Sequence, residues 1–365
     1  MGASSWFARL NGSAAVNEIG QLVAGRYEVL ELAGQGGMAL VYRAVMRGAA
    51  GFQRVVALKR VRDQLGANTE FVRMFIEEAR VCSELDHGNI VQVHDFGVDA
   101  RGYYLVMEWV DGVHVGQCMD ALARRGQAMA WRHAAAVCAQ ALSGLSAAHC
   151  RVDSEGNAAP VIHRDVTPQN ILISVGGVTK LTDFGLARAV DRAPMTGPDV
   201  VKGKLSYLAP ELVFGQAASV QSDVYAVGIV LWEMLAGARL FWGDCASERV
   251  RKVREAEVPS LAALRPNLPA QLVSIVERAL DRNPARRYES AEAMHDALML
   301  SLGSQLVSAR ELAQMAMETR VASGLSARTQ RPPRMPSSRP ANNVITQRMV
   351  VVDGGELDGN IERAS

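Results

Sequence analysis

Short apolar segments with strand-like composition dominate the chain from residue 27 to about residue 107. Five of them are rich in Val, Leu and Tyr and are separated by Gly, Asn or Asp: YEVLELAG, ALVYRAVMR, RVVALKRV, IVQVHDFGV and YYLVMEWV. Between them, NTEFVRMFIEEARVCSEL has apolar residues at spacings of three and four, with Asn68 or Thr69 available as a cap. This part is expected to be strand-rich with one main helix.

After Asp111 the pattern changes to long helices. AAAVCAQALSGLSAAHC, PAQLVSIVERALDRNP and SAEAMHDALMLSL each predict a helix. SDVYAVGIVLWEMLAG predicts another, which starts at Ser222 or Asp223 as the N-cap and stops near Gly237. We therefore expect an α+β protein, in which a small β-rich lobe precedes a larger helical lobe and EWVDG joins them.

Beyond Ser301 the composition changes again. Ser308 and Glu311 have capping-box spacing, so one extra helix is expected within residues 301–320. Residues 321–365 begin with an Arg- and Pro-rich stretch that lacks acidic residues, which is typical of a disordered basic tail. Such a tail either docks a partner or is an idle linker.

The overall charge of the chain does not favour a polyanionic binding partner. The net charge is +1 and 49% of the residues are hydrophobic, so we expect neither nucleic acid nor a membrane as a partner. The five cysteines form no C-x-x-C pair, which suits a reducing compartment. The N-terminus lacks the apolar run of a signal peptide, so a cytoplasmic location is expected.

Two features of the predicted strands have the residues of a phosphate site. GQGGMALV, from Gly34 to Val41, allows backbone amides to approach a phosphate, although a Gly-rich hairpin turn is the simpler explanation. Lys59 lies inside the apolar strand VVALKRV. It is either an edge-strand lysine that faces water or a phosphate ligand held by a carboxylate, for which Glu78 ranks before Glu77.

Two further motifs contain oxygen ligands and candidate bases. HRDVTPQN contains Asp165 and Asn170, KLTDFGLA contains Asp183, and the strands ILIS and VTKLT lie next to them. Carboxylate and amide oxygens suit Mg²⁺. Phosphoryl transfer needs charge neutralisation and an aligned hydroxyl more than covalent help. The joint occurrence of these motifs in this order makes a chance origin untenable.

In these motifs the chain resembles the eukaryotic-type protein kinases, and more closely the soluble bacterial serine/threonine kinases. The resemblance covers about residues 25–300, after an N-terminal extension at 1–24. It implies a two-lobed fold with an N-lobe at about 25–107, a hinge at 108–112 and a C-lobe at 113–300. It also implies ATP and Mg²⁺ as cofactors, with Mn²⁺ as an alternative metal, and proteins as substrates.

The resemblance assigns a role to each motif residue. Lys59 would bind the α- and β-phosphates and pair with Glu78, Asp165 would accept or orient the substrate hydroxyl proton, and Asn170 and Asp183 would bind the metal. The remaining ATP-binding residues would come from the Gly-rich loop, two strands and the hinge: Gly34, Gln35, Gly36, Gly37, Met38, Val41, Ala57, Met107, Glu108 and Val110.

The later motifs have structural and regulatory roles in the family. Glu211 of LAPE would pair with Arg287, and Asp223 would brace the catalytic loop. Thr196 and Ser206 are candidate phosphorylation sites, with Thr196 preferred, and Arg164 would bind the phosphate. Phosphorylation in trans would need only a transient homodimer. In addition, Pro168 and Tyr207 resemble the serine/threonine pattern.

The chain departs from the family pattern at three places. Ala39 replaces the third glycine of the loop, and a polar loop is inserted before the catalytic motif. Thr167 stands where a lysine is usual, and Lys204 stands where a threonine is usual. We hypothesise that Lys204 returns the missing cation, with a solvated lysine as the alternative.

Two other functions remain open from the sequence. A pseudokinase scaffold would bind nucleotide with little or no transfer activity. A small-molecule kinase is disfavoured by LAPE and the activation segment, because these parts form a platform for protein substrates.

Overall fold

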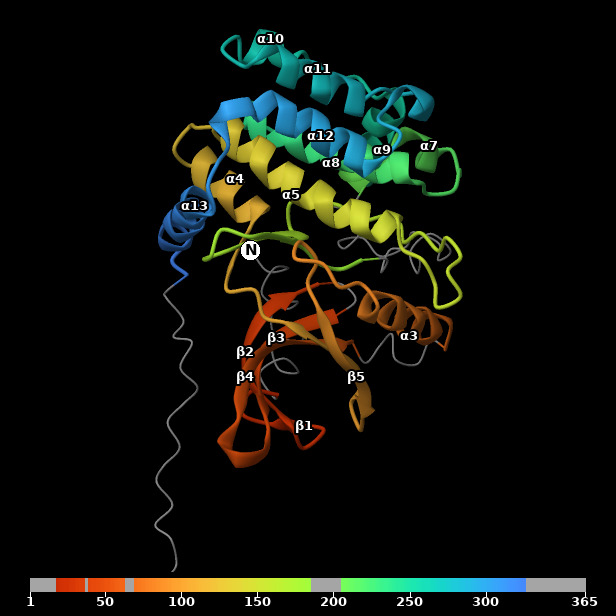
Figure 1. Cartoon of the computed structure of the whole chain (residues 1–365), viewed down its shortest axis with the longest axis vertical. Helices are drawn as coiled ribbons and strands as arrows, with labels where there is room; N and C mark the ends of the chain where they lie inside the picture. Colours follow the sequence, from red (N-terminus) through yellow and green to blue (C-terminus); the bar gives the residue numbers. More distant parts are fainter. Residues whose placement is uncertain (1–17, 37–38, 63–68, 185–204, 326–365) are drawn as a thin grey trace, which may run out of the picture. The chain divides into compact units, whose positions relative to one another are not determined.

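The computed structural model describes residues 18–36, 39–62, 69–184 and 205–325 (Figure 1). Gly37, Met38, Thr196, Lys204 and the basic tail lie outside these residues. The side chain of Glu78 is also outside the description, so its predicted pairing with Lys59 stays a prediction.

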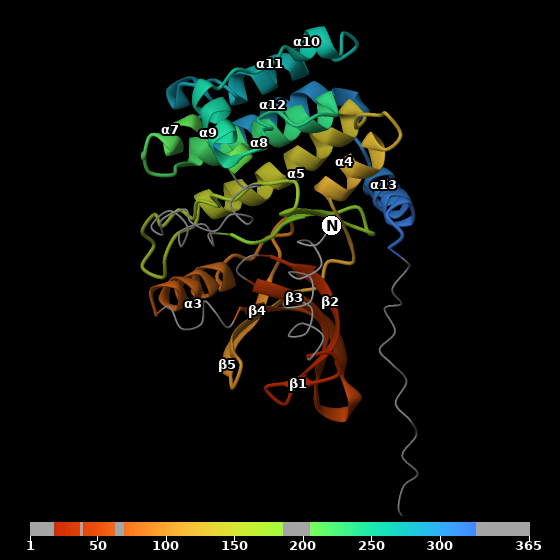
Figure 2. The same cartoon turned by 180° about the vertical axis from the view of Figure 1, so that it is seen from behind.

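The N-lobe is built on an antiparallel sheet of six strands in the order β1-β2-β3-β4-β6-β5. The five predicted strands are all present, and a two-residue strand precedes them: β1 Leu22–Val23, β2 Tyr27–Gln35, β3 Ala39–Arg47, β4 Gln53–Val61, β5 Val93–Asp99 and β6 Gly102–Glu108. Helix α3, Thr69–Ser83, is the predicted main helix and lies beside β5 (Figure 2). β4 lies between β3 and β6, so the edge-strand interpretation of Lys59 is wrong.

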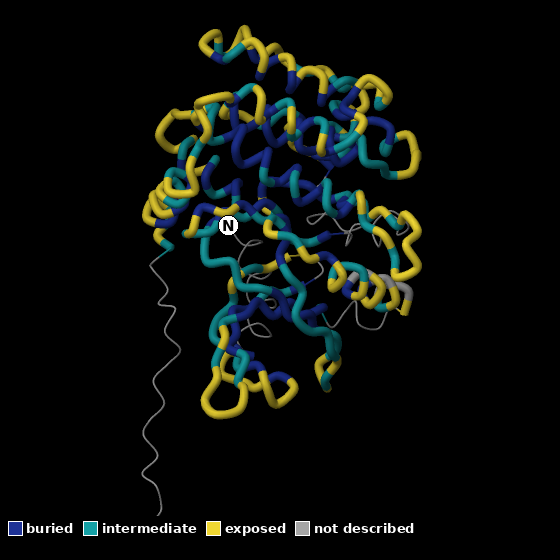
Figure 3. Tube along the Cα trace, viewed as in Figure 1, coloured by how far each residue is buried: buried dark blue, intermediate teal, exposed yellow. Residues whose placement is uncertain are grey.

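The C-lobe is mainly helical. Its helices are α4 Val115–Ala123, α5 Trp131–His149, α7 Pro210–Val213, α8 Val220–Ala236, α9 Ala246–Glu255, α10 Leu261–Leu264, α11 Ala270–Ala279 and α12 Ala291–Leu302. α5, α8 and α12 pack against one another, and their facing sides are the most buried part of the lobe (Figure 3). α8 is buried almost all round, as a helix with apolar residues on every side must be.

A small sheet of three strands lies next to the hinge. It is formed by β7 Gly112–His114, β8 Ile171–Ser174 and β9 Thr179–Leu181, in that order. β8 and β9 are the predicted strands ILIS and VTKLT, and they flank the two catalytic motifs. The backbone N–H of Thr182 donates to the carbonyl of Asn170 at 3.0 Å, which brings the two motifs together.

The start of α8 differs from the sequence prediction. Ser219 is the N-cap, and it forms a capping box with Ser222. The prediction of Ser222 or Asp223 was wrong because the Asp223 carboxylate, in the first helical turn, accepts backbone N–H groups of another segment. The predicted C-terminal residue is confirmed, since Gly237 adopts the left-handed conformation with φ of 70°.

The extra helix is α13, Ala309–Ala322, and its capping box of Ser308 and Glu311 is present. The helix belongs to the C-lobe core, because Leu312 and Ala316 are fully buried in the same apolar cluster as α5 and α8. Within the described parts of the chain, no helix is both long and apolar enough to span a bilayer.

Candidate active site

Lys59 and Asp183 form the central ion pair of the site. The Lys59 ammonium lies 2.6 Å from a carboxylate oxygen of Asp183, and the lysine side chain is only 5% exposed. A buried ammonium is stable only with such a partner. The pair joins the central strand of the N-lobe sheet to the segment after β9 in the C-lobe, so it ties the two lobes together at this point.

An apolar cluster next to this pair collects the predicted adenine-binding side chains. Ala57 and Met107 are buried in it, and Val41 and Val110 pack against it. Ala57 and Met107 are partners on neighbouring strands. Leu172 of β8 packs against the same cluster from the C-lobe. Sequence reasoning missed Leu172, whose only signal was its place two residues after Asn170.

The Gly-rich segment forms the hairpin between β2 and β3. Gly34 pairs with Val41, Gln35 pairs with Leu40, and the amide of Gly36 donates to the carbonyl of Ala39 at 2.9 Å. Ala39 is accommodated as the first residue of β3, where it pairs with Val61. The described residues on either side of 37–38 are therefore paired as two antiparallel strands, and the role of the segment as a phosphate loop stays a prediction.

The hinge residue Glu108 is held by both lobes. Its backbone N–H donates to the carbonyl of Gln92 at 2.8 Å, and its carboxylate accepts a hydrogen bond from Lys180 at 2.9 Å. Lys180 lies in β9, three residues before Asp183. The hinge is thus linked to the strand that leads into the ion pair with Lys59.

Asp165 and Asn170 contact each other directly. The amide nitrogen of Asn170 donates at 2.8 Å to both the carboxylate and the backbone carbonyl of Asp165. Thr167, which lies between these two residues in the sequence, is buried. Its backbone carbonyl accepts the N–H of Asn170 at 3.0 Å. This turn fixes the orientation of the Asp165 carboxylate.

Asp223 braces the catalytic loop through its backbone. Its carboxylate accepts the N–H groups of His163 and Arg164 at 2.7 and 2.9 Å, and it also contacts a ring nitrogen of His149 at 2.8 Å. Arg164 has a φ of 65°, in the left-handed region that is unfavourable for such a residue. These hydrogen bonds stabilise that conformation and so set the position of the following residue, Asp165.

His163 is a neutral, structural side chain. Complete burial lowers its pKa. The Asp165 N–H donates to its Nδ1, so Nε2 carries the proton and donates to the carbonyl of Thr182 at 3.1 Å. Its ring packs on Phe184, with the ring centroids 4.4 Å apart. His163 therefore connects the two motifs. Asp183, which lies between Thr182 and Phe184, has a φ of 63°, a second strained backbone position at the site.

Glu211 and Arg287 form the buried ion pair that the family pattern implies. Each of the two terminal nitrogens of the Arg287 guanidinium donates to one carboxylate oxygen of Glu211 at 2.7 Å. Arg287 also donates to backbone carbonyls of Asp281 and Gln221, and it lies over the ring of Tyr225. The pair fixes α7 to the loop before α12.

The segment before LAPE is held by a buried carboxylate, that of Glu233, which was not predicted from the sequence. Glu233 of α8 is 1% exposed, and its carboxylate accepts hydrogen bonds from the Tyr207 hydroxyl at 2.8 Å and the Leu240 N–H at 3.0 Å. Arg239 lies 3.2 Å from the same carboxylate. Burial raises the pKa of Glu233 and of Tyr207. Sequence reasoning treated Glu233 only as a break in an apolar run.

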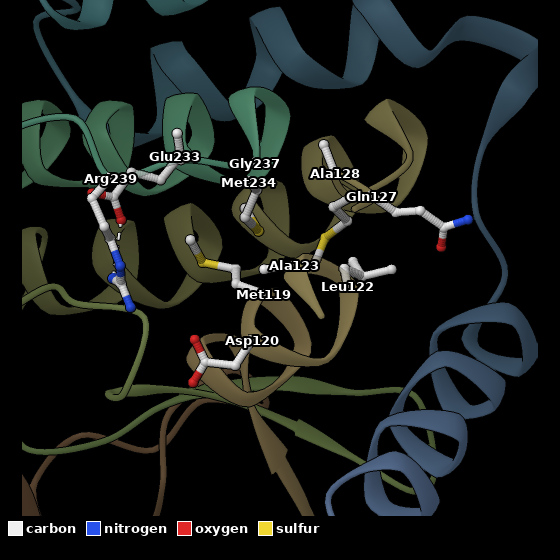
Figure 4. Close-up of a pocket in the computed structure, with 12 residues that line it drawn as sticks. Met119, Asp120, Leu122, Ala123, Gln127, Ala128, Glu233, Met234, Gly237 and Arg239 are labelled. Carbon is white, nitrogen blue, oxygen red and sulfur yellow. Dashed lines mark hydrogen bonds and ion pairs between the residues drawn. The ribbon is translucent and has the colours of Figure 1, made fainter. Parts of the chain in front are cut away.

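A small pocket lies beside this group, between α4 and the end of α8 (Figure 4). It is lined by Met119 and Met234, with Asp120, Glu233 and Arg239 also contributing. Its volume of about 140 Å³ is well below the ~300–1,000 Å³ of small-molecule sites. The pocket is therefore too small for a nucleotide.

Ser206 is packed rather than exposed. It is 8% exposed, and its hydroxyl donates to the carbonyl of Phe241 at 2.9 Å. Phosphorylation of Ser206 would require the segment to leave this position, whereas Thr196 lies outside the described residues. Glu77, the second-ranked partner of Lys59, instead forms an exposed ion pair with Arg80 at 3.0 Å.

The inserted loop before the catalytic motif lies on the surface, as predicted. Val152 pairs with Ala158, and the side chain of Asp153 accepts the N–H groups of Glu155 and Asn157. Its tip is exposed. The insertion therefore forms its own small hairpin and leaves the catalytic turn unchanged.

The oxygen donors of the site suit a magnesium-type ion. Asp165 and Asp183 supply carboxylates and Asn170 supplies an amide oxygen, and Mg²⁺ typically takes one or two carboxylates with phosphate oxygens and water. Among the described residues there is no cluster of three or more His, Cys, Asp or Glu that would hold a metal alone.

Comparison with known proteins identifies this arrangement. The model of the protein kinase domain matches residues 27–299. The chain belongs to the protein kinase family. This confirms the family predicted from the motifs, and members of the family use ATP and a divalent metal ion.

Three curated relatives from bacteria are similar to this chain. Serine/threonine-protein kinase PrkC of Bacillus subtilis is 37% identical over 276 residues, which cover 76% of this chain and 40% of the relative. PknA of Mycobacterium tuberculosis is 37% identical over 286 residues, covering 77% and 62%. Tyrosine-protein kinase MasK of Myxococcus xanthus is 34% identical over 282 residues, covering 77% and 44%. The chain thus spans between 40% and 62% of the length of these relatives.

Solved structures confirm the two-lobed kinase fold. The PknI kinase domain of Mycobacterium tuberculosis is 28% identical, with a TM-score of 0.58, over 78% of this chain and 98% of that domain. The N-lobe sheet and the helical C-lobe described above are the two parts of this fold.

Proposed function

We propose that the chain is an ATP-dependent protein kinase that phosphorylates serine and threonine hydroxyls. The observation that carries the proposal is the ion pair of Lys59 and Asp183 beside the Asn170–Asp165 contact. Nucleotide binding alone would use Lys59 and the metal ligands, whereas the Asp165 carboxylate that Asn170 orients has a task only in transfer to a hydroxyl.

Each of these residues has a chemical task. Lys59 is a fixed cation for the phosphates, and Asp183 and Asn170 supply oxygens to the metal. Mg²⁺, or Mn²⁺ in its place, neutralises phosphate charge when it is bound. Asp165, held by Asn170, accepts the hydrogen bond of the substrate hydroxyl and takes its proton as the hydroxyl oxygen bonds to the γ-phosphorus. The bond between the γ-phosphorus and the bridging oxygen of the β-phosphate breaks in the same step, and ADP leaves with that oxygen.

The site has one unusual position, Thr167, where a cation would help to stabilise the transferred group. We propose that Lys204 supplies this cation from the activation segment. Phosphorylation of Thr196, with Arg164 as the phosphate ligand, would order the same segment. A transient dimer would be enough for this modification in trans, and the basic tail would dock a protein partner.

The preference for serine and threonine rests on Pro168 and Tyr207. Tyr207 is held by Glu233, whose carboxylate accepts a hydrogen bond from the tyrosine hydroxyl at 2.8 Å. The relative MasK carries the name of a tyrosine kinase. The acceptor hydroxyl must therefore be measured.

The first experiment follows the transfer of labelled γ-phosphate from ATP to a generic protein acceptor, with Mg²⁺ or Mn²⁺. We expect wild type and the exposed-site control Asp296→Asn to label the acceptor equally, and Asp165→Asn to be at least ~100-fold slower. Hydrolysis of the product should give phosphoserine and phosphothreonine. Labelled phosphotyrosine alone would refute the preference, and nucleotide binding without label would support the pseudokinase alternative.

A further inference from the structure

The segment that joins the lobes is held from two sides at Asp111. On one side lies β8: the N–H of Val175 donates to the Asp111 carbonyl at 2.7 Å. The next residue, Gly112, lies so close to the carbonyl of Ile173 that a Cβ would be 2.0 Å from that oxygen. Only glycine fits there, so this end of the hinge cannot shift away from its register with β8.

On the other side lies α13, which follows the residues matched by the kinase family model, 27–299, in the sequence. A guanidinium nitrogen of Arg320 lies 2.8 Å from a carboxylate oxygen of Asp111, and the side chains of the two residues are 8% and 22% exposed. A charged hydrogen bond with so little solvent is stronger than a surface ion pair. Arg320 is thus placed to set the position of the Asp111 side chain, while β8 sets its backbone.

The position of Arg320 is itself well defined. Its neighbour Thr319 is buried and lies 3.5 Å from the sulfur of Cys118 on α4. Arg124, at the end of α4, donates to the carbonyl of Ala322 at 3.4 Å. The start of α13 lies directly against the turn between β8 and β9, because a Cβ at Gly177 would be 1.8 Å from the carbonyl oxygen of Ala309. The helix is therefore fixed at both ends.

We propose that Arg320 is a positioning residue for nucleotide binding, through which the helix after the kinase core sets the hinge. The nucleotide part of the proposal rests on the proposed function, because residues 108–110 are the predicted adenine-binding segment. They lie immediately before Asp111, and Val110 packs on the cluster of Ala57 and Met107. If the hinge could move at Asp111, residues 108–110 would occupy several positions. The nucleotide would bind only one of these positions, so its apparent affinity would be lower.

The test compares the full chain with Arg320→Gln, Arg320→Lys and the control Arg310→Gln. Arg310 is an exposed arginine in the first turn of the same helix, so the control loses the same charge. Hydrogen exchange of residues 108–114 and of α13 is measured without nucleotide, and the Kd of a fluorescent ADP analogue is measured by titration. We expect Arg320→Gln to exchange faster at 108–114 and to raise the Kd about tenfold. Arg320→Lys should recover part of the affinity, and Arg310→Gln should match wild type.

A second variant separates positioning from simple loss of the helix. Asp111→Asn removes the carboxylate but leaves Leu312, Ala316 and Thr319 in place, so α13 should stay protected from exchange. We expect it to raise the Kd as much as Arg320→Gln does, and the double variant to be no worse than either single variant. The proposal is overturned if Asp111→Asn with a protected α13 binds the analogue like wild type, or if wild type binds no nucleotide. Neither readout requires phosphoryl transfer, so a chain that binds but does not transfer refutes only the proposed function.

Discussion

The strongest prediction about stability concerns Arg287, whose guanidinium is almost completely buried. Replacing it with methionine keeps much of the volume but leaves the Glu211 carboxylate, 6% exposed, without its cation. It also removes donors from the carbonyls of Asp281 and Gln221. Removing one partner of a buried pair costs about 3–5 kcal/mol of unfolding free energy. For a domain spanning residues 27–299, with an unfolding entropy of ~2.1 cal/mol/K per residue, that lowers the melting temperature by roughly 5–9 °C.

Urea unfolding at pH 7.5 measures this loss directly, with Arg251→Met as the matched control. Arg251 pairs with Glu255 one helical turn away, and both are exposed. Its replacement should cost less than about 0.5 kcal/mol. The double variant Glu211→Gln with Arg287→Met should be more stable than Arg287→Met alone, because no charge is left buried. A loss below ~1 kcal/mol for Arg287→Met would refute the reasoning.

Three further predictions concern the site and the effect of pH. Lys204→Met should reduce transfer about 100-fold or more, and Lys202→Met should not, in steady-state assays; near-normal turnover of Lys204→Met would end the exchange hypothesis. Asp183→Asn should abolish the rise in melting temperature that Mg²⁺ and ATP give to wild type, and a rise of equal size would contradict its role. Burial lowers the pKa of His114, so the stability that its neutral form contributes is present above the unfolded pKa of ~6.5 and is lost as pH falls below it. His114→Asn keeps an acceptor for the first helical turn without titrating, so its melting temperature should fall less between pH 7 and 5, and curves parallel to those of wild type would rule this out.

The sequence predicts those features that depend on local pattern. Short apolar segments rich in Val, Leu and Tyr and separated by Gly, Asn or Asp identified the strands, and the spacing of Ser308 and Glu311 identified the capping box of α13. The order of the motifs identified the family and, with it, pairs that are distant in sequence, such as Glu211 with Arg287. Periodicity alone would not have found that pair, because it depends on how the lobe is packed.

The unpredicted features depend on tertiary contacts between polar groups. Glu233 is stabilised by Tyr207 and by the adjacent residues Arg239 and Leu240, which come from two different segments, and no spacing in the sequence indicates that they meet. The start of α8 was misplaced because the Asp223 side chain serves the catalytic loop. The burial of Arg320 was missed since its partner, Asp111, lies in another part of the chain.

The apolar cluster beside the ion pair has a consequence for synthesis of the protein. Ala57 and Met107 leave the ribosome well before Leu172, which covers the same cluster from the C-lobe. At about 5–20 residues per second the interval lasts several seconds. During this time the nascent N-lobe shows an uncovered apolar surface and the Lys59 ammonium without Asp183. Transiently exposed apolar surface of this kind makes a nascent chain prone to aggregation and a substrate for chaperones.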